Sequence, residues 1–191
     1  YIKDNCNDKE FMFNFMKNYG RNTIKYASRD VVLAIMNSDG DLFVWLPDEL
    51  RNDRDIVLAA VRNKGHTIQH LSDKFRNDRE VVLIALTDYP YALEYTSELK
   101  RNRDFMLAAV RQEGRALQYA SNDLKRDREV VLAAVTCYGG ALEYASEELQ
   151  NDREVVLAAV TQDGQAFAYA SKELQNDHEV VVISHSQVLN K

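Results

Sequence analysis

Long apolar segments are absent from this sequence. The apolar fraction is an ordinary 46%, but no apolar run approaches the roughly 20 residues that a membrane-spanning helix needs. No secretory signal peptide is visible at the beginning of the chain. The sequence therefore predicts no membrane span.

An excess of positive charge is also absent. The chain has 24 Lys and Arg residues against 30 Asp and Glu residues, which gives a net charge of −6. Binding to nucleic acid needs a basic stripe for the phosphates, so this balance argues against a nucleic-acid partner. Helical repeats that read RNA one base per repeat stay as a minor alternative.

Catalytic motifs are missing as well. The sequence has no glycine-rich phosphate loop, no nucleophile elbow and no cysteine with a histidine at a plausible spacing. Acidic residues are numerous, but they recur at positions where they cap helices. We therefore expect a protein that is not an enzyme, with no catalytic residues, no cofactor and no metal.

What the sequence does contain is a repeat of about 25 residues. Residues 127–135 read Asp-Arg-Glu-Val-Val-Leu-Ala-Ala-Val, and residues 152–160 read the same. A fixed period of this size indicates a stacked repeat array, so we expect residues 1–191 to form a single array. Seven complete copies and one partial copy begin at Asp8, Ser28, Asp53, Asp78, Asn102, Asp127, Asp152 and Asp177.

The first half of each repeat predicts an α-helix. It opens on Asp, Asn or Ser, which are good N-caps, and an acidic residue two positions later suits the helix dipole. In some repeats the preceding Asn52, Asn77 or Asn151 is an alternative cap. Six apolar residues follow, so the helix is apolar nearly all round and should be buried between neighbours. A strand is the competing prediction for Val-Val-Leu, but the cap, Ala-Ala and a following Gly favour a helix.

The second half of each repeat predicts a short helix and an extra turn. The Gly between the halves is expected to end the first helix in a left-handed C-cap, with Pro90 replacing it once. The short helix, for example Ala116–Ala120, is stable only through packing. A Leu or Phe in the final turn should then return to the core. The predicted fold is all-α: an α-solenoid of stacked helical hairpins, with a long helix, a short helix and an extra turn in each repeat.

A column of basic residues lies beside the acidic caps, as in Arg128 between Asp127 and Glu129. One interpretation is a solvated lattice of charges in which each pair contributes little. The other is cross-repeat pairing, in which Arg128 bonds Asp152 or Glu154 and fixes the register of stacking. The sequence leaves both open.

An aromatic residue recurs once in most repeats, near the end of the short helix. Packing between neighbouring rings is the structural explanation. The functional one is a groove lined with aromatic side chains for a protein or peptide, because Tyr and Trp are common binding anchors. The candidate partner-binding residues are Trp45, Tyr95, Tyr119, Tyr144 and Tyr169. Three variable residues after each apolar run, such as residues 136–138, are a second candidate surface.

The histidines and cysteines give weaker signals. His66 and His70 are spaced to share a helix face, but a zinc site needs three or four ligands, and His70 stands in the aromatic column. Cys6 and Cys137 lie about five repeats apart, too far for a disulfide. Unpaired thiols fit a reducing interior, so we expect an intracellular, cytoplasmic protein with Cys137 exposed.

The ends of the chain suggest a piece of a longer protein, because it opens at Tyr1 and the last repeat stops after its first helix. The polar Ser184, His185 and Ser186 favour the alternative, a natural polar cap.

The repeat Asp-Arg-Glu-Val-Val-Leu-Ala-Ala-Val, followed by Gly-x-Ala-Leu-x-Tyr-Ala-Ser-x-Glu-Leu-x-Asn, resembles a family of tandem helical repeats classed only as a domain of unknown function. The resemblance covers roughly residues 8–183 and departs at residues 42–47 and at Pro90. It implies long arrays, often in multidomain proteins of protists, large DNA viruses and intracellular bacteria, and it brings no catalytic residues. We expect a non-enzymatic scaffold that binds a protein or peptide, or alternatively an architectural spacer within a larger protein.

Overall fold

A computed structural model of the chain describes residue 5 and residues 7–189. The chain divides into two compact units, Tyr1–Tyr95 and Thr96–Lys191. Both units contain only helices and turns in the described residues, so the Val-Val-Leu segments are not strands. The fold is all-α, and each unit is built as an α-solenoid.

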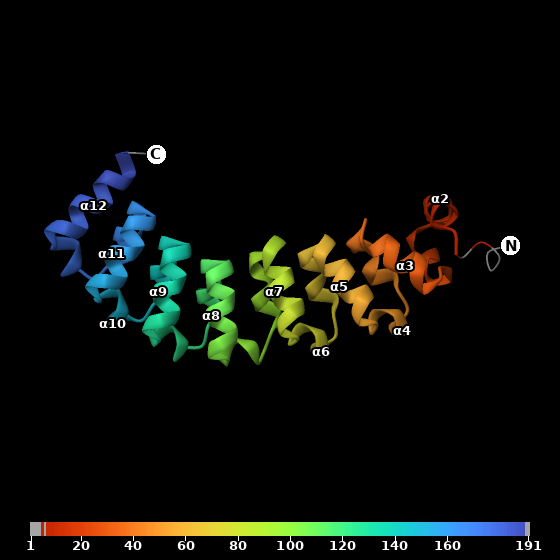
Figure 1. The fold of residues 1–191 in the computed structure, drawn as a ribbon, viewed down its shortest axis with the longest axis horizontal. Helices are drawn as coiled ribbons and strands as arrows, with labels where there is room; N and C mark the ends of the chain where they lie inside the picture. Colours follow the sequence, from red (N-terminus) through yellow and green to blue (C-terminus); the bar gives the residue numbers. More distant parts are fainter. Residues whose placement is uncertain (1–4, 6, 190–191) are drawn as a thin grey trace. The chain divides into compact units, whose positions relative to one another are not determined.

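In the first unit the α-helices and 3₁₀ helices (η) alternate. They are α2 (Lys9–Tyr19), η1 (Arg21–Tyr26), α3 (Arg29–Met36), η2 (Gly40–Trp45), α4 (Asp48–Arg51), α5 (Arg54–Asn63), η3 (Gly65–His70), α6 (Asp73–Arg76), α7 (Arg79–Asp88) and η4 (Pro90–Tyr95). The helices α3, α5 and α7 lie side by side (Figure 1).

The second unit continues the same alternation. Its helices are η5 (Leu99–Arg101), α8 (Arg103–Gln112), η6 (Gly114–Tyr119), η7 (Leu124–Arg126), α9 (Arg128–Cys137), η8 (Gly139–Tyr144), α10 (Glu147–Gln150), α11 (Arg153–Gln162), η9 (Gly164–Tyr169), η10 (Leu174–Asn176) and α12 (His178–Leu189). The helices α8, α9, α11 and α12 lie side by side, and η6 and η8 each contact the α-helix of their own repeat and that of the next (Figure 1).

The first residue of each predicted repeat is the residue that caps the long helix. The Asp53 carboxylate accepts hydrogen bonds from the N–H groups of Asp55 and Ile56 at 3.0 and 3.3 Å. Asp78, Asp127 and Asp152 cap their helices in the same way. The alternative caps Asn52, Asn77 and Asn151 instead end the preceding short helices, so that interpretation is wrong.

The apolar run of each long helix is buried on one face and partly open on the other. In α9, Val130, Val131, Ala134 and Val135 are fully buried, whereas Leu132 and Ala133 are only partly buried. The expectation of burial all round holds for α5, where Ile56–Val61 are buried, but it is wrong for α8, α9 and α11. The helices pack on the core with one face, and that leaves a half-exposed Leu-Ala pair on the other.

The short second helix is a 3₁₀ helix, and part of its burial pattern follows the three-residue period of that helix. Gly114, Leu117 and Ala120 are buried at spacings of three residues, and Gly139, Leu142 and Ala145 repeat the pattern. Ala116 and Ala141, each directly before the leucine, are buried as well. The final turn returns Phe75, Leu99, Leu124, Leu149 and Leu174 to the core as predicted, while Leu50 is only half-buried.

The glycines between the two helices have a different role from the one predicted. Among the described residues, Gly20 alone has a positive φ, of 97°, so the other described glycines are not left-handed C-caps. Instead they permit close approach: a Cβ on Gly114 would lie 2.6 Å from the carbonyl oxygen of Ala134 in the next repeat, and one on Gly139 would lie 2.5 Å from that of Ala159. The glycine is needed because the neighbouring backbone occupies the space of a side chain.

Candidate functional site

The aromatic column lies at the last residue of successive 3₁₀ helices. We call this row the aromatic edge; its members in the first unit are Tyr26, Trp45, His70 and Tyr95, and those in the second are Tyr119, Tyr144 and Tyr169. Within each unit the consecutive 3₁₀ helices contact one another: η1 contacts η2, η2 contacts η3, and η3 contacts η4 in the first unit, and η6 contacts η8 and η8 contacts η9 in the second. All five residues proposed from the sequence therefore belong to such rows.

The members of the aromatic edge differ in exposure. Tyr26 and Trp45 are 49% and 47% exposed, and Tyr169 is 37% exposed. Tyr119 and Tyr144 are half-buried. The exposed rings can contact a partner with much of their surface. The half-buried rings pack against the fold and leave a smaller part of their surface accessible.

Open clefts lie beside the aromatic edge at the boundary between repeats. In the second unit a cleft of about 500 Å³ is bordered by Tyr144, Ser146 and Glu147 of one repeat and by Lys125 and Arg126 of the repeat before it. The two sides are joined where the Ser146 N–H donates to the carbonyl oxygen of Lys125 at 2.9 Å. The Ser146 hydroxyl oxygen is buried and has no hydrogen-bond partner among the described residues.

The same position in the first unit also carries a cleft. It measures about 290 Å³ and is lined by Arg51 and Asn52 on one side and by His70, Leu71 and Ser72 on the other. A basic residue of one repeat thus faces the aromatic-edge residue of the next in both clefts. The pair Lys100 and Tyr119 follows the same pattern, with the ammonium 5.8 Å from the ring centroid. The arrangement follows from the repeat itself.

Burial and nearby charge shift the pKa values of three groups in and near the larger cleft. Burial lowers the pKa of the Lys125 ammonium beside the cleft. Burial, and then the Glu143 carboxylate, raise the pKa of the Tyr144 phenol. The phenol of Tyr169 has a raised pKa because of the same carboxylate. Both phenols therefore remain protonated donors at neutral pH.

The structure adds ring contacts made by tyrosines at the end of the variable positions. Tyr89 lies 5.7 Å from Tyr91 and 6.4 Å from Tyr95, between ring centroids. In the second unit the guanidinium of Arg115 lies 4.3 Å from the ring centroid of Tyr138. The signal in the sequence is a tyrosine directly before the Gly or Pro at the start of the short helix, at Tyr19, Tyr89 and Tyr138, where the other repeats have Asp, Lys or Glu.

The variable residues after each apolar run are partly structural. The side chains of Asn63, Asp88 and Gln162 accept hydrogen bonds from the glycine N–H of the preceding repeat, at 2.8, 3.0 and 2.6 Å. The residue after them can cap the 3₁₀ helix, as Asp163 does for the Gln165 N–H at 3.1 Å. Asn, Asp and Gln are therefore interchangeable at this position as acceptors for the glycine N–H of the preceding repeat.

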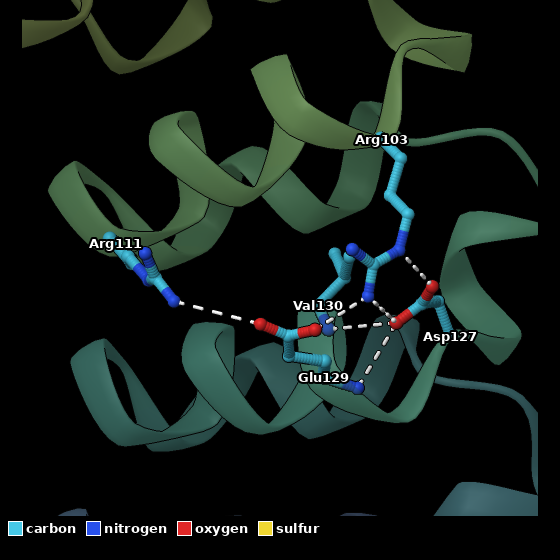
Figure 2. Close-up of polar contacts among 5 residues, drawn as sticks. All are labelled: Arg103, Arg111, Asp127, Glu129 and Val130. Atoms are coloured by element: carbon cyan, nitrogen blue, oxygen red, sulfur yellow. Dashed lines mark hydrogen bonds and ion pairs between the residues drawn. The ribbon is translucent and has the colours of Figure 1, made fainter.

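The basic column forms cross-repeat ion pairs. Figure 2 shows Arg103, whose guanidinium lies 2.7 Å from the Asp127 carboxylate and 2.6 Å from that of Glu129 in the next repeat. Arg128 bridges Asp152 and Glu154 in the same manner, with the Asp152 contact at 3.0 Å. The predicted cross-repeat contacts are therefore present, while the contribution of each pair to stability stays a prediction. The same geometry recurs for Arg29 with Asp53 and Asp55, Arg54 with Asp78 and Glu80, and Arg153 with Asp177 and Glu179.

Each bridged Asp also caps a helix. Asp127 accepts from the N–H groups of Glu129 and Val130 at 3.1 and 3.2 Å (Figure 2). The Arg103 hydrogen bond and these N–H groups together lower the pKa of the Asp127 carboxyl, against the effect of burial. The charges of this ladder are engaged in contacts between repeats, so the ladder is first of all a stacking contact.

The histidines and the described cysteine lie outside the ion-pair ladder. His66 Nε2 lies 2.8 Å from Asp41 Oδ1 in the preceding repeat, and burial lowers the pKa of His70. No group of three or more His, Cys, Asp or Glu side chains suited to a metal occurs among the residues that the structure describes. Cys137 is an exposed free thiol, as predicted, and Cys6 lies outside the described residues.

Helices paired in a 25-residue register, with each repeat bonded to the next through the same residues, define an α-solenoid repeat protein. The chain belongs to the family described as a domain of unknown function, DUF4116, whose model matches residues 28–76, 53–100, 78–125, 127–175 and 152–183. Most of these matches span two consecutive repeats. The search of curated proteins found no match, and the search of solved structures found none either. No helix within the described part of the chain is long and apolar enough to cross a membrane.

Proposed function

We propose that this chain is a non-enzymatic repeat scaffold that binds a protein or peptide along its aromatic edge. The observation that carries the proposal is the recurring cleft in which a basic residue of one repeat faces the aromatic-edge residue of the next. Trp, Tyr and Arg are enriched among the residues that contribute most to binding at protein interfaces. The net charge of −6 argues for a protein or peptide over nucleic acid.

The absence of enzymatic activity and the cellular location are parts of the same proposal. Acidic side chains such as Asp127 and Asp152 act as helix caps and take part in cross-repeat pairs, which supports a role in the fold for these acids. An exposed free thiol at Cys137 supports a reducing, intracellular setting.

The test uses the whole chain as an affinity matrix with edge variants. Trp45→Ala and Tyr169→Ala remove exposed rings of the aromatic edge and should reduce recovery of a bound protein at least about tenfold. Tyr19→Ala is the matched control, because Tyr19 is 69% exposed and lies at the end of α2, off the edge. Recovery that is equally reduced by all three variants, or by none, contradicts the proposal.

An architectural spacer within a larger protein is the second candidate. The cross-repeat ladder favours it, because paired charges join consecutive repeats at five boundaries within the units and can fix their spacing. A spacer retains no protein on the matrix. Its expected property is mechanical, and a segment inserted between two domains should hold them at a constant separation.

A further inference from the structure

A second surface lies on the long helices of the second unit and is separate from the aromatic edge. The Leu-Ala stripe consists of the half-exposed pairs Leu107 and Ala108 on α8, Leu132 and Ala133 on α9, and Leu157 and Ala158 on α11. Each pair occupies the same repeat position, and the three helices lie side by side (Figure 1). The stripe therefore crosses three helices in one line.

Shallow troughs lie between these helices. The first has a volume of about 490 Å³, and its floor is Leu132 and Ala133, with Thr136 and Cys137 at one end and Glu129 at the other. The second measures about 540 Å³, with Leu157 and Ala158 in the floor and Glu154 at its rim. Apolar floors at regular intervals, with polar rims, are the form of a surface for a partner helix.

The charges at the rims are not balanced in the same way. Glu129 is shared by Arg103 at 2.6 Å and Arg111 at 3.8 Å. Glu154 pairs with Arg128, but Thr136 stands where the preceding repeat has Arg111. The side chain of Glu154 is 70% exposed. The second trough therefore has a carboxylate at its rim that a basic side chain of a partner can pair with.

The spacing of the troughs favours a helix over an extended chain. Packed helices lie about 8–10 Å apart, so successive troughs recur at that distance. An α-helix turns the same face outward every two turns, about 11 Å, which places residues seven apart in successive troughs. A strand covers the same distance in three residues, and residues three apart point to opposite faces.

We propose that the Leu-Ala stripe binds an amphipathic helix that lies across α8, α9 and α11. Its apolar side chains, seven residues apart, fill the two troughs, and a Lys or Arg beside them pairs with Glu154. The site is independent of the aromatic edge, because it is built from the α-helices and not from the 3₁₀ helices.

The test follows protection of the Cys137 thiol, which lines the first trough. The protein is the whole chain with Cys6→Ser, so that Cys137 is its one thiol. The probe is a synthetic helical peptide of about 18 residues, about 27 Å long, with leucines seven apart and flanking lysines. We expect the rate of alkylation by iodoacetamide to fall at least about threefold with saturable dependence on peptide concentration.

Two comparisons make the result specific. Leu157→Lys should weaken binding at least about tenfold, because a buried apolar contact is lost and a like charge faces the lysines. Gln165→Lys, at an exposed position on η9, should leave it unchanged; circular dichroism checks that both variants are folded. A peptide with glutamate in place of each lysine should bind at least about tenfold more weakly.

Three outcomes overturn the proposal. They are no protection at millimolar peptide, equal protection by the lysine and glutamate peptides, and self-association of the free chain in sedimentation velocity that Leu157→Lys abolishes. The last result assigns the stripe to a second copy of the chain. Trp45→Ala and Tyr169→Ala should not alter protection, so failure here is distinguishable from failure of the aromatic-edge proposal.

Discussion

Two adjacent glycines in the sixth repeat, Gly139 and Gly140, are limited by different neighbours. Backbone atoms limit the space at the first, and side-chain atoms limit it at the second. A Cβ on Gly139 would lie 2.5 Å from the carbonyl oxygen of Ala159, which is backbone of the next repeat. A Cβ on Gly140 would lie 2.7 Å from ring atoms of Tyr138. A ring can rotate away, whereas a packed backbone cannot move without separating two repeats.

We therefore expect Gly139→Ala to destabilise the protein by about 1–3 kcal/mol through overpacking. Gly140→Ala should cost clearly less, since Tyr138 can yield. Urea unfolding followed by circular dichroism measures both free energies of unfolding. Equal losses would show that the carbonyl contact does not restrict Gly139.

The buried alanine of the long helix has a similar limit. Ala134 is fully buried, and its carbonyl oxygen faces Gly114 of the preceding repeat. Ala134→Phe should lower stability by about 1–3 kcal/mol, and the exposed Cys137→Phe should lower it much less. Thermal melting compares the two; a larger loss for Cys137→Phe would mean that the buried face has been assigned incorrectly.

The roles of some single residues can be predicted from the sequence, and the roles of others cannot. Asp53 and Asp152 can be predicted as caps, because an N-cap side chain bonds the N–H groups of the turn that directly follows it. The role of Gly139 cannot be predicted, because its constraint comes from Ala159, a residue 20 positions away. Tyr138 has the same limitation, since its contact with Arg115 depends on how two repeats are stacked.

At the scale of the element, the ladder joins the beginning of each long helix to the next. Arg128 on α9 bonds Asp152, and Asp152 in turn accepts from the N–H groups that open α11. The sequence alone does not decide between cross-repeat pairing and a solvated lattice of charges, because partly exposed pairs contribute little in most proteins. The structure adds that the same pairing recurs in both units.

A double-mutant cycle tests whether the pairing contributes to stability. Arg128→Ala and Asp152→Ala should each lower the melting temperature, and the double variant should lose less than the sum of the two. The coupling should weaken as NaCl rises, because salt screens exposed charges. Additive losses at low salt would mean that the contact has no net effect. Arg111→Ala is the control, since its nearest acid is 3.8 Å away.

The short helix shows where prediction from the sequence ends at this scale. The pattern Gly-x-x-Leu-x-x-Ala already has a period of three, which matches a 3₁₀ helix. Over six residues, however, a period of 3.0 cannot be told from one of 3.6, and isolated short helices have no stability of their own. The helix type follows from packing between two α-helices.

At the scale of the whole chain, the caps link stability to pH. Hydrogen bonds from arginine are the largest cause that lowers the carboxyl pKa of Asp53, Asp127 and Asp152. The Val180 N–H is the largest for Asp177. For Asp78, burial opposes the shift, but the Val81 N–H and Arg54 outweigh it. A lowered pKa means that the folded state binds the proton more weakly than the unfolded state does, so ionisation of the carboxyl group stabilises the fold.

These groups contribute stability that is fully present above the unfolded pKa of about 4 and is lost as the pH falls through the lower folded values. We expect the melting temperature to change little from pH 5 to 7 and to fall steeply below about pH 4. Arg128→Gln should make the fall shallower, because the pKa of Asp152 returns toward its ordinary value. A melting temperature that is the same at pH 3 and pH 6 would contradict this linkage.

The architecture of each unit was predictable because one motif recurs, and a residue type that is shared between copies at one position indicates the same structural role in each. The aromatic edge was located by the same recurrence, at Trp45, Tyr119 and Tyr169. Its clefts were not, since they form between Lys125 of one repeat and Tyr144 of the next, and spacing alone does not show that these residues meet. The half-exposed Leu-Ala pairs were likewise hidden, because Leu and Ala look alike whether they are covered or open.

The ladder has a polarity that bears on how such chains change during evolution. Arg103 pairs with the repeat after it, and Asp127 pairs with the repeat before it. A repeat of this kind therefore supplies the arginine of one ion pair and the aspartate of another. Contacts of this head-to-tail kind do not close on themselves. A copy inserted within either unit by internal gene duplication would find a complementary neighbour on each side without compensating substitutions, so the number of copies can change while the contact stays the same.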